Sequence, residues 1–146
     1  MQRSGRAFTL LELVVALAAV AIVAAFALPG WRGQIARGHR IDAIAALYRA
    51  AQFVDAQSPS LASLPAGMDQ APPAGAAVYR LKLLAADEMN GGYSIMAVPM
   101  EAGPMRDDPC GAFVLDANGT RGNQAPGTNA AAPGTAPKPR DCWRDR

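Results

Sequence analysis

Few residues in this sequence have types and spacing that could carry out chemistry. His39 is the single histidine and lies among arginines, where a solvated helix face accounts for it. No serine has an evident base partner, so the pattern of an activated nucleophile is missing. Asp107 and Asp108 precede Pro109 and suggest a cation site or, more simply, a turn, because no ligand-rich loop surrounds them. The sequence therefore predicts neither an enzyme nor a bound metal or cofactor.

Cys110 and Cys142 are the two cysteines of the chain. Behind a membrane or export segment they would face an oxidising compartment, which favours a disulfide between them. Closing a loop of this length stabilises a fold by about 3–4 kcal/mol in the chain-entropy model. Two separate buried thiols are an alternative. A metal site is a weaker one, because His39 lies far away in sequence.

Glu12 is the residue whose position most needs an explanation. It lies near the start of an apolar run, and no polar side chain occurs from Leu13 to Leu28. A carboxylate in hydrocarbon costs about 2–3 kcal/mol on insertion scales. The run is long enough to span a bilayer, which takes about 20 residues, and Arg3 and Arg6 ahead of it favour a cytoplasmic start.

Two simple interpretations of the run leave Glu12 unexplained. One is a plain membrane anchor. The other is a secretory signal peptide with a small-x-small cleavage site at Ala25-Phe26-Ala27, although the apolar run is long for such a peptide.

The run AFTLLELVVALAAVAIVAAFALP resembles the N-terminus of the type IV pilins. In that family a prepilin peptidase cuts after a short basic leader and just ahead of a Phe, which is then methylated. A glutamate four residues later and a helix-bending proline complete the motif. The resemblance implies cleavage between Ala7 and Phe8, N-methylation of Phe8, and roles in filament assembly for Glu12 and Pro29. Gly is usual before the cut, so Ala7 predicts slower cleavage.

Such processing would explain why a carboxylate stands near the start of the apolar run. Cleavage creates a positive amine on Phe8, which can meet Glu12 of a neighbouring subunit when the apolar helices bundle together. Removing one partner of a buried ion pair costs about 3–5 kcal/mol. The carboxylate would thus act as a register check on each subunit that enters a filament.

The elements that must position these residues are a long helix and a small sheet. A leader at 1–7 is followed by a transmembrane or assembly helix at 8–30 and its amphipathic half at 31–57. In this half, apolar residues recur at three- and four-residue spacing: Ile41, Ile44, Ala45, Tyr48 and Ala51. Region 58–146 contains a helix-to-sheet loop and strands at 77–84, 92–100 and 112–116, with turns at Asn90-Gly91-Gly92 and Asn118-Gly119. This is an α+β arrangement, and the resemblance implies the type IV pilin fold with a C-terminal disulfide-bounded loop.

The C-terminal region carries a second, narrower resemblance. The stretch DPCGAFVLDANGTRGN and the late CW resemble the PilE-like pilins, which implies a Cys110–Cys142 bridge followed by Trp143. Residues 123–140 are of low complexity and predict a flexible insert. Asn118-Gly119-Thr120 fits a glycosylation sequon, although a hairpin turn explains it more simply.

Nucleic-acid binding is the sharpest rival prediction. Basic residues surround Trp143 in KPRDCWRDR and could grip phosphates while the indole stacks on a base. Asp141 and Asp145 dilute this patch, and packing of Trp143 against the sheet explains the indole better. The pattern therefore disfavours nucleic acid as a partner.

These observations predict a structural subunit, a PilE-like minor pilin for adhesion or twitching motility. It would sit in the bacterial inner membrane as a single-pass protein with a periplasmic C-terminal domain, and later in a pilus on the cell surface. Expected partners are other pilin subunits, the prepilin peptidase/methyltransferase, the inner-membrane assembly platform and the membrane itself. A major subunit, a type II secretion pseudopilin and a DNA-receptor minor pilin are the alternatives.

Overall fold

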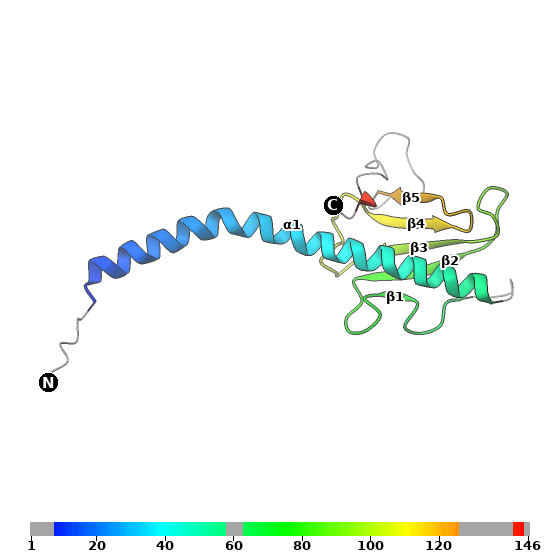
Figure 1. Cartoon of the computed structure of the whole chain (residues 1–146), viewed down its shortest axis with the longest axis horizontal. Helices are drawn as coiled ribbons and strands as arrows, with labels where there is room; N and C mark the ends of the chain where they lie inside the picture. Colours follow the sequence, from blue (N-terminus) through cyan, green and yellow to red (C-terminus); the bar gives the residue numbers. More distant parts are fainter. Residues whose placement is uncertain (1–7, 58–62, 126–141, 145–146) are drawn as a thin grey trace. The chain divides into compact units, whose positions relative to one another are not determined.

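The computed structural model describes residues 8–57, 63–125 and 142–144. Figure 1 shows the elements formed by these residues, one helix and five strands: α1 (Leu10–Ala56), β1 (Gln70–Ala71), β2 (Tyr79–Leu84), β3 (Ser94–Pro99), β4 (Ala112–Asp116) and β5 (Arg121–Gln124). The chain divides into two compact units, one ending at Ile35 and one beginning at Ala36, and each is described by itself.

The first unit holds the N-terminal part of α1. Its large apolar side chains from Phe8 to Phe26 are between 52% and 82% exposed, so this part of the helix has no core of its own. By length and composition α1 can cross a membrane. The predicted helix is confirmed, and it continues without a break through Pro29. Because Pro29 has no N–H, the helical hydrogen bond to the carbonyl of Ala25 is missing there.

The second unit packs the rest of α1 on the sheet. The five strands form one sheet in the order β1-β2-β3-β4-β5, and every neighbouring pair is antiparallel. The helix lies along one face of this sheet (Figure 1). The largest fully buried side chains come from the helix and the three central strands: Leu47, Tyr79, Ile95, Phe113 and Leu115.

The helix face that packs on the sheet is not the predicted one. The buried stripe consists of small residues and two larger ones: Ala43, Ala46, Leu47, Ala50 and Val54. Of the predicted stripe, Ile41, Ala45 and Tyr48 are exposed, and Ile44 and Ala51 are half-buried. The alanines let the helix backbone approach the sheet closely, whereas the bulkier Ile41 and Tyr48 lie outside the contact. The larger apolar side chains therefore did not indicate which face of the helix is buried.

The sheet has two more strands than were predicted. The three expected strands are present as β2, β3 and β4, which confirms the antiparallel α+β prediction. β1 and β5 were missed, and the stretch predicted as a flexible insert, 123–140, begins inside β5. That part of the prediction is wrong, because Asn123 pairs with Phe113 in the ladder. The rest of the predicted insert, from residue 126, lies outside the described residues.

Two asparagines fix the predicted turns. The Asn90 side chain accepts hydrogen bonds from the backbone N–H groups of Asp87 and Gly92, both at 3.0 Å, and donates to Ala85 O at 2.9 Å. Asn118 Nδ2 donates to the carbonyl of Met89 at 3.0 Å, which ties the β4–β5 turn to the β2–β3 loop. The amide of Asn118 thus has a structural partner, which supports the turn explanation of its sequon.

Candidate functional site

Thr9 forms the N-terminal cap of α1. Its hydroxyl oxygen accepts a hydrogen bond from the N–H of Glu12 at 3.2 Å, and its carbonyl accepts one from Leu13 N at 3.2 Å. A threonine cap followed three residues later by glutamate is a recurrent helix start, because both groups serve unpaired N–H groups of the first turn. Phe8 is the residue just ahead of this cap, and Ala7 lies outside the described residues.

Glu12 also has a role at the start of the helix that was not predicted from the sequence. It is the acidic residue in the first turn of α1, where the positive end of the helix dipole favours a carboxylate by about 0.3–1 kcal/mol. Its side chain is exposed, and it forms no hydrogen bond or ion pair with any other described residue. The helix dipole thus gives one physical reason for an acid at this position.

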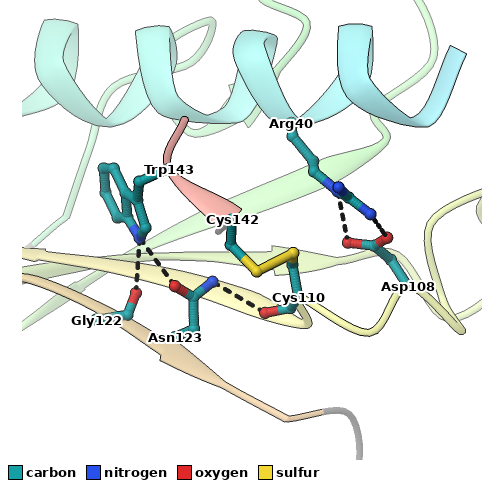
Figure 2. Close-up of a disulfide and its surroundings, with 7 residues drawn as sticks. All are labelled: Arg40, Asp108, Cys110, Gly122, Asn123, Cys142 and Trp143. Carbon is teal, nitrogen blue, oxygen red and sulfur yellow. Dashed lines mark hydrogen bonds and ion pairs between the residues drawn. A yellow bond between two sulfur atoms is a disulfide. The ribbon is translucent and has the colours of Figure 1, made fainter. Parts of the chain in front are cut away.

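The disulfide fastens the C-terminal end of the chain to the sheet. Cys110 and Cys142 are bonded, with their Cα atoms 5.7 Å apart, which confirms the predicted pairing. Trp143 Nε1 donates to Asn123 Oδ1 at 2.9 Å and to the Gly122 carbonyl at 3.3 Å. Asn123 Nδ2 in turn donates to the carbonyl of Cys110 at 3.0 Å (Figure 2). The bridge is therefore one part of a buried network that also holds β5.

Trp143 is a packing residue. It is only 8% exposed, and its ring meets that of Phe113 edge to face, with centroids 5.5 Å apart. The guanidinium of Arg121 lies 5.7 Å from the ring centroids of both Trp143 and Tyr48. With its N–H donated and its ring covered, the indole cannot stack on a nucleic-acid base. Arg144 is exposed, and the other basic residues of the predicted patch lie outside the described residues.

Asp108 forms an ion pair with the helix instead of a cation site. Arg40 of α1 donates from Nε to Asp108 Oδ2 at 3.1 Å and from Nη2 to Oδ1 (Figure 2). This hydrogen bond raises the pKa of Arg40. Asp107 is exposed and pairs with its neighbour Arg106 at 3.1 Å. No cluster of metal-ligating side chains occurs among the described residues. Neither Arg40 nor Asn123 was predicted to act here, since nothing in the sequence relates them to their partners.

Tyr79 lies beside this ion pair with an unsatisfied hydroxyl. Its side chain is fully buried, and its Oη has no hydrogen-bond partner among the described residues. Burial raises the pKa of Tyr79 well above its ordinary value, and the charge of Asp108 adds to this effect. His39 is half-buried on α1 and has no described catalytic partner.

The first prediction concerns the bridge. Replacing both cysteines, Cys110→Ser with Cys142→Ser, should lower the free energy of unfolding by about 3–4 kcal/mol, because the unfolded chain regains the freedom of the open loop. Urea unfolding of the full chain in neutral detergent would measure this loss. Adding a reductant should destabilise the natural chain to a similar degree and leave the double variant unchanged. A loss below about 1 kcal/mol would contradict the prediction.

The second prediction concerns alkaline pH. Tyr93 donates to Asp55 Oδ1 at 2.7 Å, and burial together with this bond raises the pKa of Tyr93 to about 12. The folded state thus holds the phenolic proton more tightly than the unfolded chain, whose tyrosines titrate near pH 10. Stability should be intact below pH 10 and fall as the pH rises from 10 to 12.

Urea midpoints measured from pH 8 to 11.5 would test this dependence. Tyr93→Phe should make the alkaline decline shallower, since no hydroxyl remains to ionise at that site, while the part of the decline due to buried Tyr79 should remain. Tyr48→Phe, which changes an exposed tyrosine of the same domain, is the matched control and should leave the decline as it is. Equal declines in all three proteins would show that the Tyr93 bond does not contribute.

Comparison with known proteins finds a family match for the N-terminal region of the chain. Residues 2–28 match the family described as "Prokaryotic N-terminal methylation motif", so the chain carries this motif. No curated protein matches the chain. Among solved structures, a type IV pilin from Shewanella oneidensis is similar, with 28% sequence identity over 59% of this chain and 89% of that one and a TM-score of 0.40.

Proposed function

We propose that this protein is a type IV pilin, a structural subunit made as a prepilin and assembled into a filament through α1. The prepilin peptidase cuts between Ala7 and Phe8, and the new amine of Phe8 is methylated. The observation that carries the proposal is the methylation motif over residues 2–28, which stands at the start of a capped helix with exposed apolar side chains. The role is structural and not catalytic.

The length of the helix supports a membrane stage before assembly. From Leu10 to Trp31 the helix rises about 32 Å at 1.5 Å per residue, close to the hydrocarbon thickness of about 30 Å. The exposed side chains of this segment suit lipid first and the helices of neighbouring subunits later. The subunit therefore resides in the inner membrane, with its disulfide-bonded domain in the periplasm, until the assembly platform moves it into the pilus.

Within this class we favour a minor pilus subunit of the PilE-like type, with a role in adhesion or twitching motility. The support is the C-terminal arrangement, in which a cysteine ahead of β4 is bonded to a Cys-Trp pair that closes over β5. A type II secretion pseudopilin shares the processing motif and is the second candidate. Deleting the gene separates the two, because loss of twitching and surface pili supports the first and loss of an exported enzyme supports the second.

A DNA-receptor role has weaker support. The indole that would stack on a base is covered by Phe113 and Arg121, and only Arg144 of the basic residues near it is described. Salt-sensitive DNA binding that is lost on Arg144→Gln would argue for this role.

The decisive experiment is to determine the N-terminus of the membrane-extracted protein by mass spectrometry. We expect a chain that begins at Phe8 and is one methyl group heavier than its sequence. Ala7→Gly is the matched variant and should increase the processed fraction, because glycine is the usual residue ahead of the cut. A chain that begins at Leu28 would show signal-peptide cleavage, and one that keeps Met1 even in the Ala7→Gly variant would show a plain anchor; either result would overturn the proposal.

A further inference from the structure

The end of the apolar segment carries two exposed residues that capping and filament assembly leave unexplained. Trp31 is 68% exposed, and its neighbours one helical turn away, Ala27 and Ile35, are exposed as well. A tryptophan in water leaves a large apolar ring uncovered, and its indole N–H forms no hydrogen bond with any described residue. The ring is thus available to another molecule.

Arg32 follows directly and is also exposed. It forms no ion pair with a described acidic residue, whereas Arg40, Arg80 and Arg106 each have one. No acidic residue occurs between Glu12 and Asp42, so this stretch of the helix is positively charged. An exposed arginine in such a stretch suits an anion from outside the subunit.

The position of this pair selects the kind of anion. On the proposed membrane-spanning helix, Trp31 and Arg32 fall about 32 Å from Leu10, which is the level of the phosphate groups. Tryptophan is enriched at this level because its ring is apolar and its N–H is polar. An arginine there meets the phosphate in a bidentate fashion. Charge and depth both favour a phospholipid head group over an acidic protein surface.

Resting on the proposed membrane stage, we infer that Trp31 and Arg32 form an interfacial anchor that binds an anionic phospholipid. Trp31 inserts its ring between the upper acyl chains and the head groups, and Arg32 pairs with the phosphate. The anchor fixes the depth of the helix at the periplasmic surface, at the end opposite to Glu12. A subunit waiting for assembly is thereby held at one height in the bilayer.

Quenching of tryptophan by brominated lipids tests the anchor. The full chain is reconstituted in phosphatidylcholine vesicles that contain either brominated phosphatidylglycerol or brominated phosphatidylcholine, and fluorescence is measured at low and high salt. The signal of Trp143, which is buried in the domain, is obtained from a Trp31→Phe chain and subtracted. We expect the anionic lipid to associate with Trp31 about fivefold more strongly than the neutral one, as one arginine near the surface allows.

Arg32→Gln should remove this preference, and so should high salt. Arg49→Gln is the matched control, because Arg49 is an exposed arginine of the same helix that lies about 25 Å further along it and should leave the preference intact. Equal quenching by the two lipids, or a preference that survives Arg32→Gln, would overturn the anchor while leaving the pilin proposal in place. If the quenching of Trp31 depended on the protein-to-lipid ratio and not on lipid charge, the partner of Trp31 would be a second copy of the chain. A chain that does not float with the vesicles would instead overturn the membrane stage itself.

Discussion

Replacing Glu12 by alanine should abolish incorporation of the subunit into filaments while leaving its insertion in the membrane unchanged. In the bilayer, Glu12 lies about 3 Å along the helix from Leu10, near the head groups, so its charge remains hydrated at little cost. In the proposed filament the same turn is enclosed by neighbouring apolar helices, and the methylated amine of Phe8 on another subunit is the counter-charge that we propose for it. Losing the carboxylate leaves that amine unpaired, at a cost of about 3–5 kcal/mol per subunit.

Two further variants separate this role from helix capping. Glu12→Gln removes the charge and leaves the Thr9 cap in place, whereas Thr9→Ala keeps the charge but removes the cap, the hydrogen bond from Glu12 N to Thr9 Oγ1 at 3.2 Å. We expect Glu12→Gln to fail like Glu12→Ala, and Thr9→Ala to assemble with a helix start weakened by about 1 kcal/mol. The measurement is the fraction of subunit recovered in sheared filaments relative to the membrane fraction.

The opposite pattern would assign Glu12 to the helix start alone. If Glu12→Gln assembled normally and Thr9→Ala did not, the register-check hypothesis would have to be abandoned. Normal assembly of Glu12→Ala would have the same consequence, because no counter-charge could then be required.

The elements that the sequence predicted correctly are those with a strong local signal. The helix follows from one apolar run and one amphipathic run, and β2, β3 and β4 follow from apolar stretches between Asn-Gly turns. β5 has the sequence RGNQ, without one apolar side chain, so no periodicity could reveal it. It pairs with β4, and its residues Asn123 and Gly122 also accept hydrogen bonds from Trp143, about 20 residues later in the chain. Such a strand depends on tertiary contacts that a single sequence does not display.

The residues of the candidate site also differ in whether a local sequence signal indicates them or only tertiary contacts relate them. The bridge between Cys110 and Cys142 could be predicted from the sequence and is present, whereas the roles of Phe8 and Glu12 stay predictions. Arg40 and Asp108 are 68 residues apart and belong to no motif. Their relation depends on how the helix packs on the sheet, and that packing was itself predicted on the wrong face. An error in the buried face of one helix thus also hid the most buried ion pair among the described residues.

Replacing Arg40 by methionine should destabilise the domain by about 3–5 kcal/mol, because it removes one partner of a largely buried ion pair. The side chain of Asp108 is only 5% exposed, and that of Arg40 is 25% exposed. Without the guanidinium, the carboxylate of Asp108 remains buried, and no described cation replaces the lost partner. The loss should also loosen Cys110, two residues further on, because the ion pair holds that loop against α1.

The chain supplies its own control for this prediction. Arg80 and Asp69 also form an ion pair, through a single hydrogen bond at 2.8 Å, but their side chains are 44% and 32% exposed. Arg80→Met should therefore cost only about 0–1 kcal/mol, since water replaces the partner. Urea unfolding of the full chain in neutral detergent, followed by the near-ultraviolet circular dichroism of Trp143, would compare the two losses directly.

A double variant separates the destabilisation caused by an unpaired buried carboxylate from the net stabilisation that the ion pair provides. Arg40→Met combined with Asp108→Leu removes both charges and should recover most of the stability that Arg40→Met loses, because a buried ion pair is often replaceable by apolar side chains. If the double variant were as unstable as the single one, the loss would come from altered packing of the helix on the sheet. If Arg40→Met cost no more than Arg80→Met, burial would not be what makes the Arg40–Asp108 pair important.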